Sequence, residues 1–201
     1  EIKEWAASPS YYRKRTLLRI LPIAVTVINF LCISLAILGI ISANIAGGVF
    51  VSFVLFSTIF SKGITKLQTT YGEKLQVLST YADQILLTEQ KEMHSHILQE
   101  LKADLTSQNQ TASQAVRQLS KLMNALDQRS NLLMSTILNG LIFWELRQVM
   151  RIEKWKEIHA SDLPRWIETI GEIDAYCSLA TFAYNHPDYI YPTIAAQSFH
   201  L

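Results

Sequence analysis

Few side chains in this sequence have both the type and the spacing that chemistry requires. His94 and His96 are the only closely spaced histidines, but residues two positions apart on a helix lie on different faces, whereas zinc-binding histidines of one helix are four positions apart. Cys177 has no histidine at a spacing typical of a catalytic pair, and a lone cysteine in an apolar helix usually packs in a core. These residues predict neither a metal site nor a nucleophile.

The sequence also lacks a motif for nucleotide hydrolysis. The phosphate-binding pattern G-x-x-x-x-G-K-[ST] does not occur, and the pair Gly47-Gly48 lies in an apolar stretch with no lysine after it. We therefore expect this chain, taken by itself, not to be an enzyme and to hold no cofactor.

One later segment gathers charged residues of both signs. Mixed signs indicate either a solvated helix surface or a set of internal ion pairs. Nucleic-acid binding normally needs a clustered basic excess, and the net charge of the chain is only +1, so DNA contact is the less favoured interpretation. The charged residues are Glu145, Arg147, Arg151, Glu153, Lys154, Lys156 and Glu157.

The elements that carry these residues are predicted to be helices. Hydrophobic residues make up 49% of the chain and charged residues 17%, against about 25% charged in a typical globular protein. Seven glycines and five prolines leave little turn chemistry, which favours a few long helices over a sheet of many strands. Cys32 and Cys177 are far apart in apolar contexts, which is typical of small buried thiols in a reducing compartment.

Residues 20–61 contain no charged side chain, and a membrane-spanning helix needs about 20 residues, so this stretch can hold two. We expect spans at 21–41, with Pro22 in the first turn, and at about 45–60, separated by a break at 42–44. The alternative is a hairpin buried inside a soluble bundle. Basic residues on both sides and none in the loop fit a hairpin that enters and leaves from the cytoplasm: Arg13, Lys14, Arg15 and Arg19 before it, Lys62 and Lys66 after it. Tyr11 and Tyr12 are candidate interface anchors.

Two long amphipathic helices are predicted next, joined by a polar tip at residues 107–113 and packed antiparallel. The second helix is expected to run to about Trp155, with Gly140 marking either a kink or a close helix crossing. Apolar residues recur in steps of three and four along both. The first stripe is Ile64, Leu67, Tyr71, Leu75, Leu78, Ala82, Ile85, Met93, Ile97, Leu101 and Leu105, and the second is Ala112, Val116, Leu119, Leu122, Leu126, Leu133, Ile137, Leu141 and Trp144.

A last helix is predicted to begin at Ser161-Asp162-Leu163-Pro164, where a capping side chain precedes an early proline. It is expected to stop at Asn185-His186-Pro187 and to lead into an extended connector at residues 189–194. Its apolar stripe, predicted to be buried, is Leu163, Ile167, Ile170, Ile173, Tyr176, Cys177, Ala180 and Ala183.

The predicted fold class is therefore all-α: a long antiparallel helical hairpin or bundle with an N-terminal hydrophobic helical hairpin. Its predicted parts are a basic lead-in at 1–19, the hydrophobic and presumed transmembrane hairpin at 20–62, the helical bundle at 63–187 and a connector at 188–201.

Residues 139–194 carry a more specific pattern: Ile173-Asp174-Ala175, then Ser178-Leu179-Ala180-Thr181, then Tyr189-x-Tyr191-Pro192. This stretch resembles the end of the core region of the MutS family of DNA mismatch-repair ATPases, where such a helix closes the lever bundle and hands the chain to the ATPase domain. The resemblance implies that ATP and Mg²⁺ are bound by a domain after Leu201. The candidate coupling and connector residues are Asp174, Ser178, Tyr189, Tyr191 and Pro192.

Two departures limit this resemblance. The tip at residues 107–113 is too short to hold the DNA-gripping clamp domain of mismatch-recognising members, and the first 62 residues have no counterpart in the repair enzymes. The resemblance is thus to a divergent, membrane-associated bacterial paralogue.

The function expected from the resemblance is that of a non-catalytic lever and core segment. It would transmit nucleotide state between its own ATPase domain and the lever tip, in a homodimer at the bacterial inner membrane with its helical region in the cytoplasm, and with DNA binding a weaker expectation. Two alternatives stay open: a membrane-anchored coiled-coil interaction or signalling module, and a soluble cytoplasmic protein.

Overall fold

The computed structural model describes residues 2–106, 110–127 and 132–190, and within these residues every regular element is a helix. An isolated bridge between Thr106 and Thr111 is the sole extended pairing among the described residues. The predicted all-α class is confirmed. The helices are α1 (Ile2–Ala7), α2 (Thr16–Ile37), α3 (Ala43–Gln90), α4 (His96–Asp104), α5 (Ala112–Asp127), α6 (Leu132–Ile142), α7 (Trp144–His159) and α8 (Leu163–Asn185).

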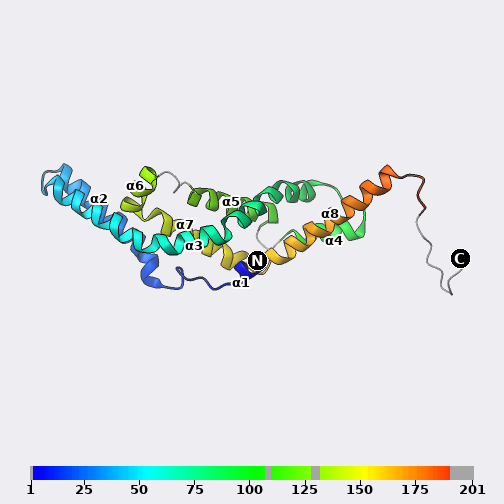
Figure 1. The fold of residues 1–201 in the computed structure, drawn as a ribbon, viewed down its shortest axis with the longest axis horizontal. Helices are drawn as coiled ribbons and strands as arrows, with labels where there is room; N and C mark the ends of the chain where they lie inside the picture. Colours follow the sequence, from blue (N-terminus) through cyan, green and yellow to red (C-terminus); the bar gives the residue numbers. More distant parts are fainter. Residues whose placement is uncertain (1, 107–109, 128–131, 191–201) are drawn as a thin grey trace.

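The molecule is elongated, with three regions in a row (Figure 1). The hairpin of α2 and the start of α3 forms one end, the body of α3, α5, α6 and α7 lies in the middle, and α8 extends beyond the body at the other end, with α4 beside it. The apolar hairpin and the end of α8 therefore project in opposite directions.

Helix α3 joins the first two regions without interruption. It has 48 residues, which corresponds to about 70 Å at 1.5 Å per residue. The boundary predicted between residues 62 and 63 therefore falls inside a helix. At Gly63 of this helix the Tyr12 hydroxyl lies where a β-carbon would stand. The absence of a side chain at Gly63 therefore lets Tyr12 approach α3 closely.

The first amphipathic helix is shorter than predicted, because α3 ends at Gln90 and the chain is extended at Lys91. Side chains of α4 satisfy carbonyls in this break: Gln99 Nε2 donates to Met93 O at 2.8 Å, and Lys102 Nζ donates to Lys91 O at 2.7 Å. Residues 107–109 of the predicted polar tip lie outside the described residues. On its two sides Ala112 N donates to Leu105 O, and α5 begins at Ala112.

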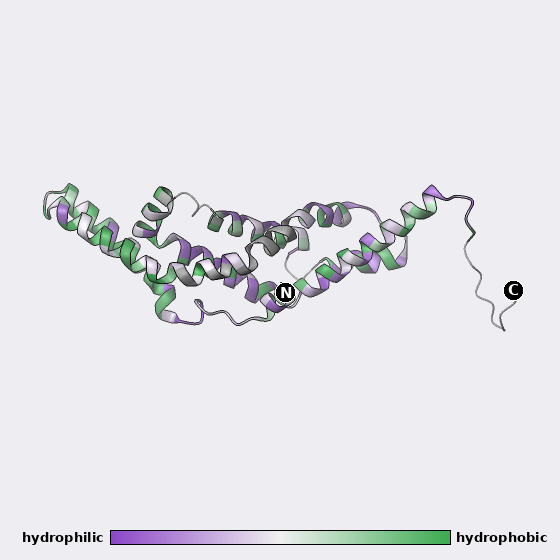
Figure 2. Ribbon diagram, viewed as in Figure 1, coloured by the Kyte–Doolittle hydropathy of each residue, from purple (hydrophilic) through white to green (hydrophobic). Residues whose placement is uncertain are grey.

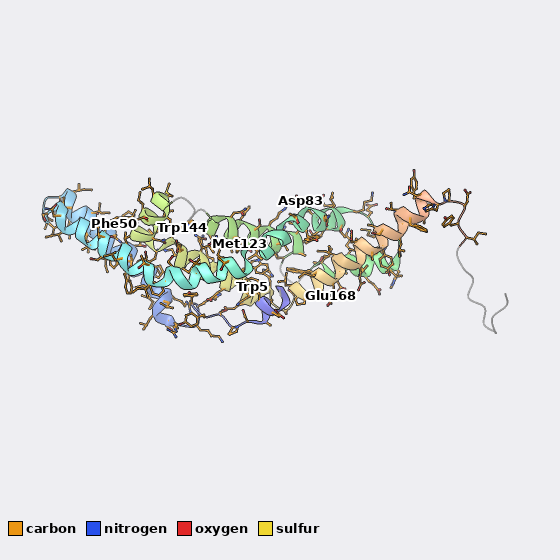
Figure 3. The ribbon with its side chains drawn as sticks, viewed as in Figure 1. Trp5, Phe50, Asp83, Met123, Trp144 and Glu168 are labelled. Carbon is orange, nitrogen blue, oxygen red and sulfur yellow. The ribbon has the colours of Figure 1, made fainter. Side chains whose placement is uncertain are left out.

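The predicted antiparallel pairing holds between α3 and α5, which pack along each other through the middle of the molecule. In Figure 3 Met123 of α5 lies in this body, whereas Phe50 of α3 lies in the hairpin. The buried stripe comprises Ile64, Ala82 and Ile85 of α3 with Ala115, Val116, Leu119, Met123 and Leu126 of α5. Burying each large apolar side chain stabilises the fold by roughly 1.5–3 kcal/mol.

The prediction of one second helix running to Trp155 is wrong, because α6 and α7 are separate helices. Phe143, between them, has φ 52°, a left-handed conformation that is unusual for a residue with a β-carbon. Its ring is buried and touches Phe53, Phe56 and Phe60 of α3, at centroid distances of 6.1–6.4 Å. This packing compensates the strained backbone.

Gly140 marks a close crossing and not the break itself. A β-carbon at Gly140 would lie 2.5 Å from Val54 Cγ2 and would also collide with the Phe50 ring, both on α3. The crossing lets α6 approach the hairpin, but it leaves Leu133 and Ile137, predicted to be buried, exposed at 79% and 48%.

The hairpin itself consists of two helices long and apolar enough to cross a membrane: Thr16–Ile37 and Ala43–Ser61, the first part of α3. In Figure 2 most residues of the two helices are hydrophobic, and many of their large apolar side chains are exposed. The first helix begins five residues earlier than the predicted span at 21–41, and its turn comes earlier too, because Gly39 adopts φ 73° after the last turn. Pro22 consequently lies inside α2.

Candidate functional site

Helix α8 positions the residues that the sequence singled out. It begins at Leu163 with Pro164 in its first turn, as predicted, and Leu163, Trp166 and Thr169 are buried against the body. The expected side-chain cap is absent, since the Asp162 carboxylate accepts no hydrogen bond from the first backbone N–H groups of α8. The start of α8 is therefore held by apolar burial.

Beyond Ile173 the same helix leaves the body. Residues 174–190, here called the α8 tip, carry large apolar side chains with high exposed fractions, including Leu179 at 65%, Phe182 at 53% and Tyr184 at 86%. The prediction that the apolar stripe of α8 is buried along its whole length is wrong, because its large apolar side chains beyond Ile173 are exposed.

The two cysteines are both free thiols, as predicted, but their burial is not as predicted. Cys177 is exposed on the α8 tip and Cys32 is half-buried in the hairpin. Among the described residues, Cys177 therefore lies on an uncovered helix face, whereas Cys32 is partly covered.

The structure brings only part of the predicted coupling set together. Asp174 and Ser178 lie one helical turn apart on the exposed tip. Tyr189 folds back on the end of α8, where its ring stacks on His186 at 4.7 Å and meets Phe182 edge-on at 5.8 Å. Tyr191 and Pro192 lie outside the described residues.

These rings border an open groove of about 570 Å³ on the α8 tip. Its lining is almost entirely apolar and aromatic, with His186 as the one histidine among Tyr176, Leu179, Phe182, Pro187 and Tyr189. An open groove of this composition suits side chains of another protein surface better than a polar substrate.

Helix α7 carries the charged segment, and the structure places much of it inside the body. Glu153 is 4% exposed, and its carboxylate accepts three backbone N–H donors: Tyr11 at 2.8 Å, Tyr12 at 3.1 Å and Arg13 at 2.6 Å. The sequence does not reveal this contact, because the donors precede Glu153 by about 140 residues. The segment before the hairpin is thus fastened to α7.

Lys156 extends the same contact. Its Nζ donates to Ser8 Oγ at 3.0 Å and lies 5.5 Å from the centre of the Trp5 ring, which stacks on Trp155. Burial lowers the pKa of Lys156, and the nearby carboxylates of Glu153 and Glu157 oppose that shift. Tyr12 is buried here rather than serving as an interface anchor, and burial next to Glu153 raises its pKa.

A smaller polar cavity of about 270 Å³ lies where α3, α6 and α7 meet at the base of the hairpin. Ser135 Oγ donates to the buried Glu145 carboxylate at 3.1 Å, and Glu145 N donates to Asn139 Oδ1 at 3.0 Å. Arg147 Nη2 donates to Pro22 O and to Thr26 Oγ1 of α2. Across the described residues no cluster of three or more His, Cys, Asp or Glu side chains could hold a metal ion.

Comparisons of the chain with protein-family models, with curated proteins and with solved structures gave no match.

Proposed function

We propose that this chain is the non-catalytic lever and core segment of a MutS-related ATPase, held at a membrane by α2 and the first turns of α3. The observation that carries the proposal is the α8 tip. Asp174, Ser178 and Tyr189, three residues on which the MutS resemblance depends, lie on the α8 tip, whose apolar side chains the body leaves uncovered. An element that hands the chain to a following domain needs such a surface.

The arrangement of rods supports a transmitting role. Helix α3 runs from the hairpin through the body as one element, and α5 and α7 brace it there. At the far side the buried start of α8 packs on α4, where Arg165 pairs with Asp104 at 3.6 Å. A rotation of the α8 tip would therefore move a braced body and not a loose linker.

The partners follow from the proposal. ATP and Mg²⁺ would bind a domain after residue 201, and the α8 tip would pack against that domain. A homodimer in the full protein and DNA contact elsewhere in it are further parts of the proposal, the latter the weaker. The basic residues at both ends of the hairpin favour a body in the cytoplasm of a bacterium, below its inner membrane.

The first test is the reading frame after Leu201, which the proposal expects to encode G-x-x-x-x-G-K-[ST]. The longer protein should hydrolyse ATP, and residues 1–201 alone should not. Leu179→Asp in the longer protein should lower ATP turnover, because it places a charge in the proposed contact, whereas Glu172→Gln, an exposed change on the same helix, should not. ATP hydrolysis by residues 1–201, or a frame without a phosphate-binding motif, would refute the proposal.

A second candidate is a membrane-anchored helical interaction or signalling module. The same apolar α8 tip favours it, since the groove there also fits a helix of a separate protein. The frame after Leu201 separates the two, because this module needs no nucleotide-binding domain.

A further inference from the structure

We propose that α6 and the turn at Phe143 enter the lipid bilayer beside the hairpin, forming a re-entrant element whose outer face contacts phospholipid acyl chains. This inference rests on the membrane anchoring proposed above, and it adds a third element to the two candidate spans.

The first argument is depth along the hairpin. Helix α2 has 22 residues, or about 33 Å, close to the thickness of the hydrocarbon core of a bilayer. The C-terminal end of α6 meets it at Asn29, near its middle, and Gly140 crosses α3 at Phe50 and Val54, well inside the span Ala43–Ser61. If the hairpin spans the bilayer, the end of α6 lies near the midplane.

The second argument is the surface of α6. Residues 132–142 contain no charged side chain, and Leu133 and Ile137 are exposed at 79% and 48%. These side chains lie on a helix packed against both spans, whose own outer side chains, such as Ile23 at 60%, are equally exposed. The apolar surface of α6 is therefore continuous with that of the hairpin, which indicates that both surfaces face the same medium.

The third argument is the backbone at the break. A helix that ends inside hydrocarbon leaves carbonyls that water cannot reach, so protein groups must satisfy them. Asn29, 2% exposed, donates from Nδ2 to Gly140 O at 2.9 Å and to Leu141 O at 3.3 Å. On the other side of the break the Asn139 side chain accepts the N–H of Glu145. A single buried asparagine of α2 thus satisfies carbonyls at the end of the broken helix.

The test is spin-label accessibility in the chain of residues 1–201, reconstituted in vesicles of phosphatidylethanolamine and phosphatidylglycerol. Cys32 and Cys177 are replaced by alanine, and single cysteines are placed at Ile137 in α6, at Ile23 in α2 as the lipid reference, and at Leu179 on the α8 tip as the water reference. All three sites are exposed, so the fold should tolerate the label. The ratio of collision with oxygen to collision with a water-soluble nickel chelate is then measured.

We expect the ratio at Ile137 to match that at Ile23 and to exceed that at Leu179 several-fold. A lipid-like ratio at Ile23 with a water-like ratio at Ile137 would overturn the inference and leave the membrane anchoring intact. Water-like ratios at both would overturn the anchoring as well. Spin–spin broadening at Ile137 would mean that a second copy of the chain covers α6, which would also overturn the inference.

Discussion

Helices α7 and α8 reverse the usual relation between hydropathy and burial. Helix α7 is rich in charged and polar residues, yet Glu145, Gln148, Glu153, Lys156 and His159 are all less than 10% exposed. Helix α8 is richer in apolar residues, yet its second half is exposed. The difference teaches that position in the molecule, and not composition, decides burial here, because α7 is surrounded by α2, α3, α5 and α6 while the second half of α8 projects beyond the body.

The two helices also differ in what their exceptional residues do. The buried charged groups of α7 hold other parts of the chain, as Glu153 holds the segment at residues 11–13 and Arg147 holds α2. The exposed apolar groups of the α8 tip keep much of their surface uncovered, so the free energy of burying that surface is available to a partner. The contrast separates residues that serve the fold from residues that serve an interface.

The largest expected effect is at Glu153. Glu153→Ala removes the acceptor of three backbone N–H groups, and breaking such a buried charged contact costs about 4 kcal/mol. Because total stability is typically 5–15 kcal/mol, as a rough general range, the segment before α2 should detach. Trypsin cleavage after Arg13 or Lys14, compared with the unaltered chain in the same detergent, measures the release.

The matched control for Glu153 is Glu157→Gln. Glu157 pairs with Arg13 at 3.0 Å, but its side chain is 40% exposed, so its loss should cost less than about 1 kcal/mol. Equal cleavage rates in the two variants would contradict the assigned role of Glu153.

Two leucines on α8 test the contrast within one helix. Leu163→Ala, at a fully buried position, should lower the free energy of unfolding by about 3 kcal/mol, whereas Leu179→Ala should change it by less than about 0.5 kcal/mol. Urea unfolding followed by circular dichroism measures both. A large loss at Leu179 in the chain of residues 1–201 would mean that the α8 tip is covered within this chain, and the contrast would fail.

Alanine substitutions at two helical glycines should change the free energy of unfolding by smaller amounts, and in opposite directions. Gly140→Ala should destabilise the chain by about 2 kcal/mol, since the new methyl group must displace Phe50 and Val54. Gly171→Ala has open space around it and should stabilise α8 by about 0.5–1 kcal/mol through helix propensity. Thermal unfolding of both variants measures these changes. If Gly140→Ala left the stability unchanged, the packing of α6 on α3 would not depend on their close approach at Gly140.

Much of the architecture is predictable because it follows from local periodicity. The apolar steps of three and four predicted the pairing of α3 with α5, and the early proline at Pro164 predicted the start of α8. The pairing of two helices can be predicted from the sequence where the apolar stripe of one faces the apolar stripe of the other. The uncharged stretch likewise predicted the two candidate spans.

The rest depends on contacts that no local pattern contains. The break at Phe143 is possible because three phenylalanines of α3 surround its ring, about 85 residues earlier in the chain. The burial of Glu153 depends on donors at residues 11–13. At the α8 tip the prediction failed in the opposite sense, because the apolar stripe predicted burial and the tip is exposed. An apolar stripe indicates that a helix face will be covered, but not by which element or partner. The position of the candidate site on α8 was predictable from the sequence, but the extension of the α8 tip beyond the body was not.

The smallest expected effect is pH-dependent and belongs to α7. His159 is 4% exposed between the rings of Trp155 and Trp166, and burial lowers its pKa below the usual value near 6.5, with Asp162 opposing the shift. Below pH 6.5 the unfolded chain therefore binds a proton that the folded chain does not. Stability should fall as pH drops from about 6.5 to the folded pKa, by at most about 1.4 kcal/mol per pH unit, and level off below it.

His159→Phe isolates this contribution, because it keeps an aromatic ring between the two tryptophans and removes the titrating group. The variant should lose the part of the slope that His159 contributes, while His94→Gln, at an exposed position, serves as the control. Urea unfolding at several pH values between 5 and 8, roughly the range in which histidine titrates, measures the difference. Identical slopes in the unaltered chain and His159→Phe would show that burial does not keep His159 neutral. The contrast with α8 would then depend on the other four buried polar residues, Glu145, Gln148, Glu153 and Lys156.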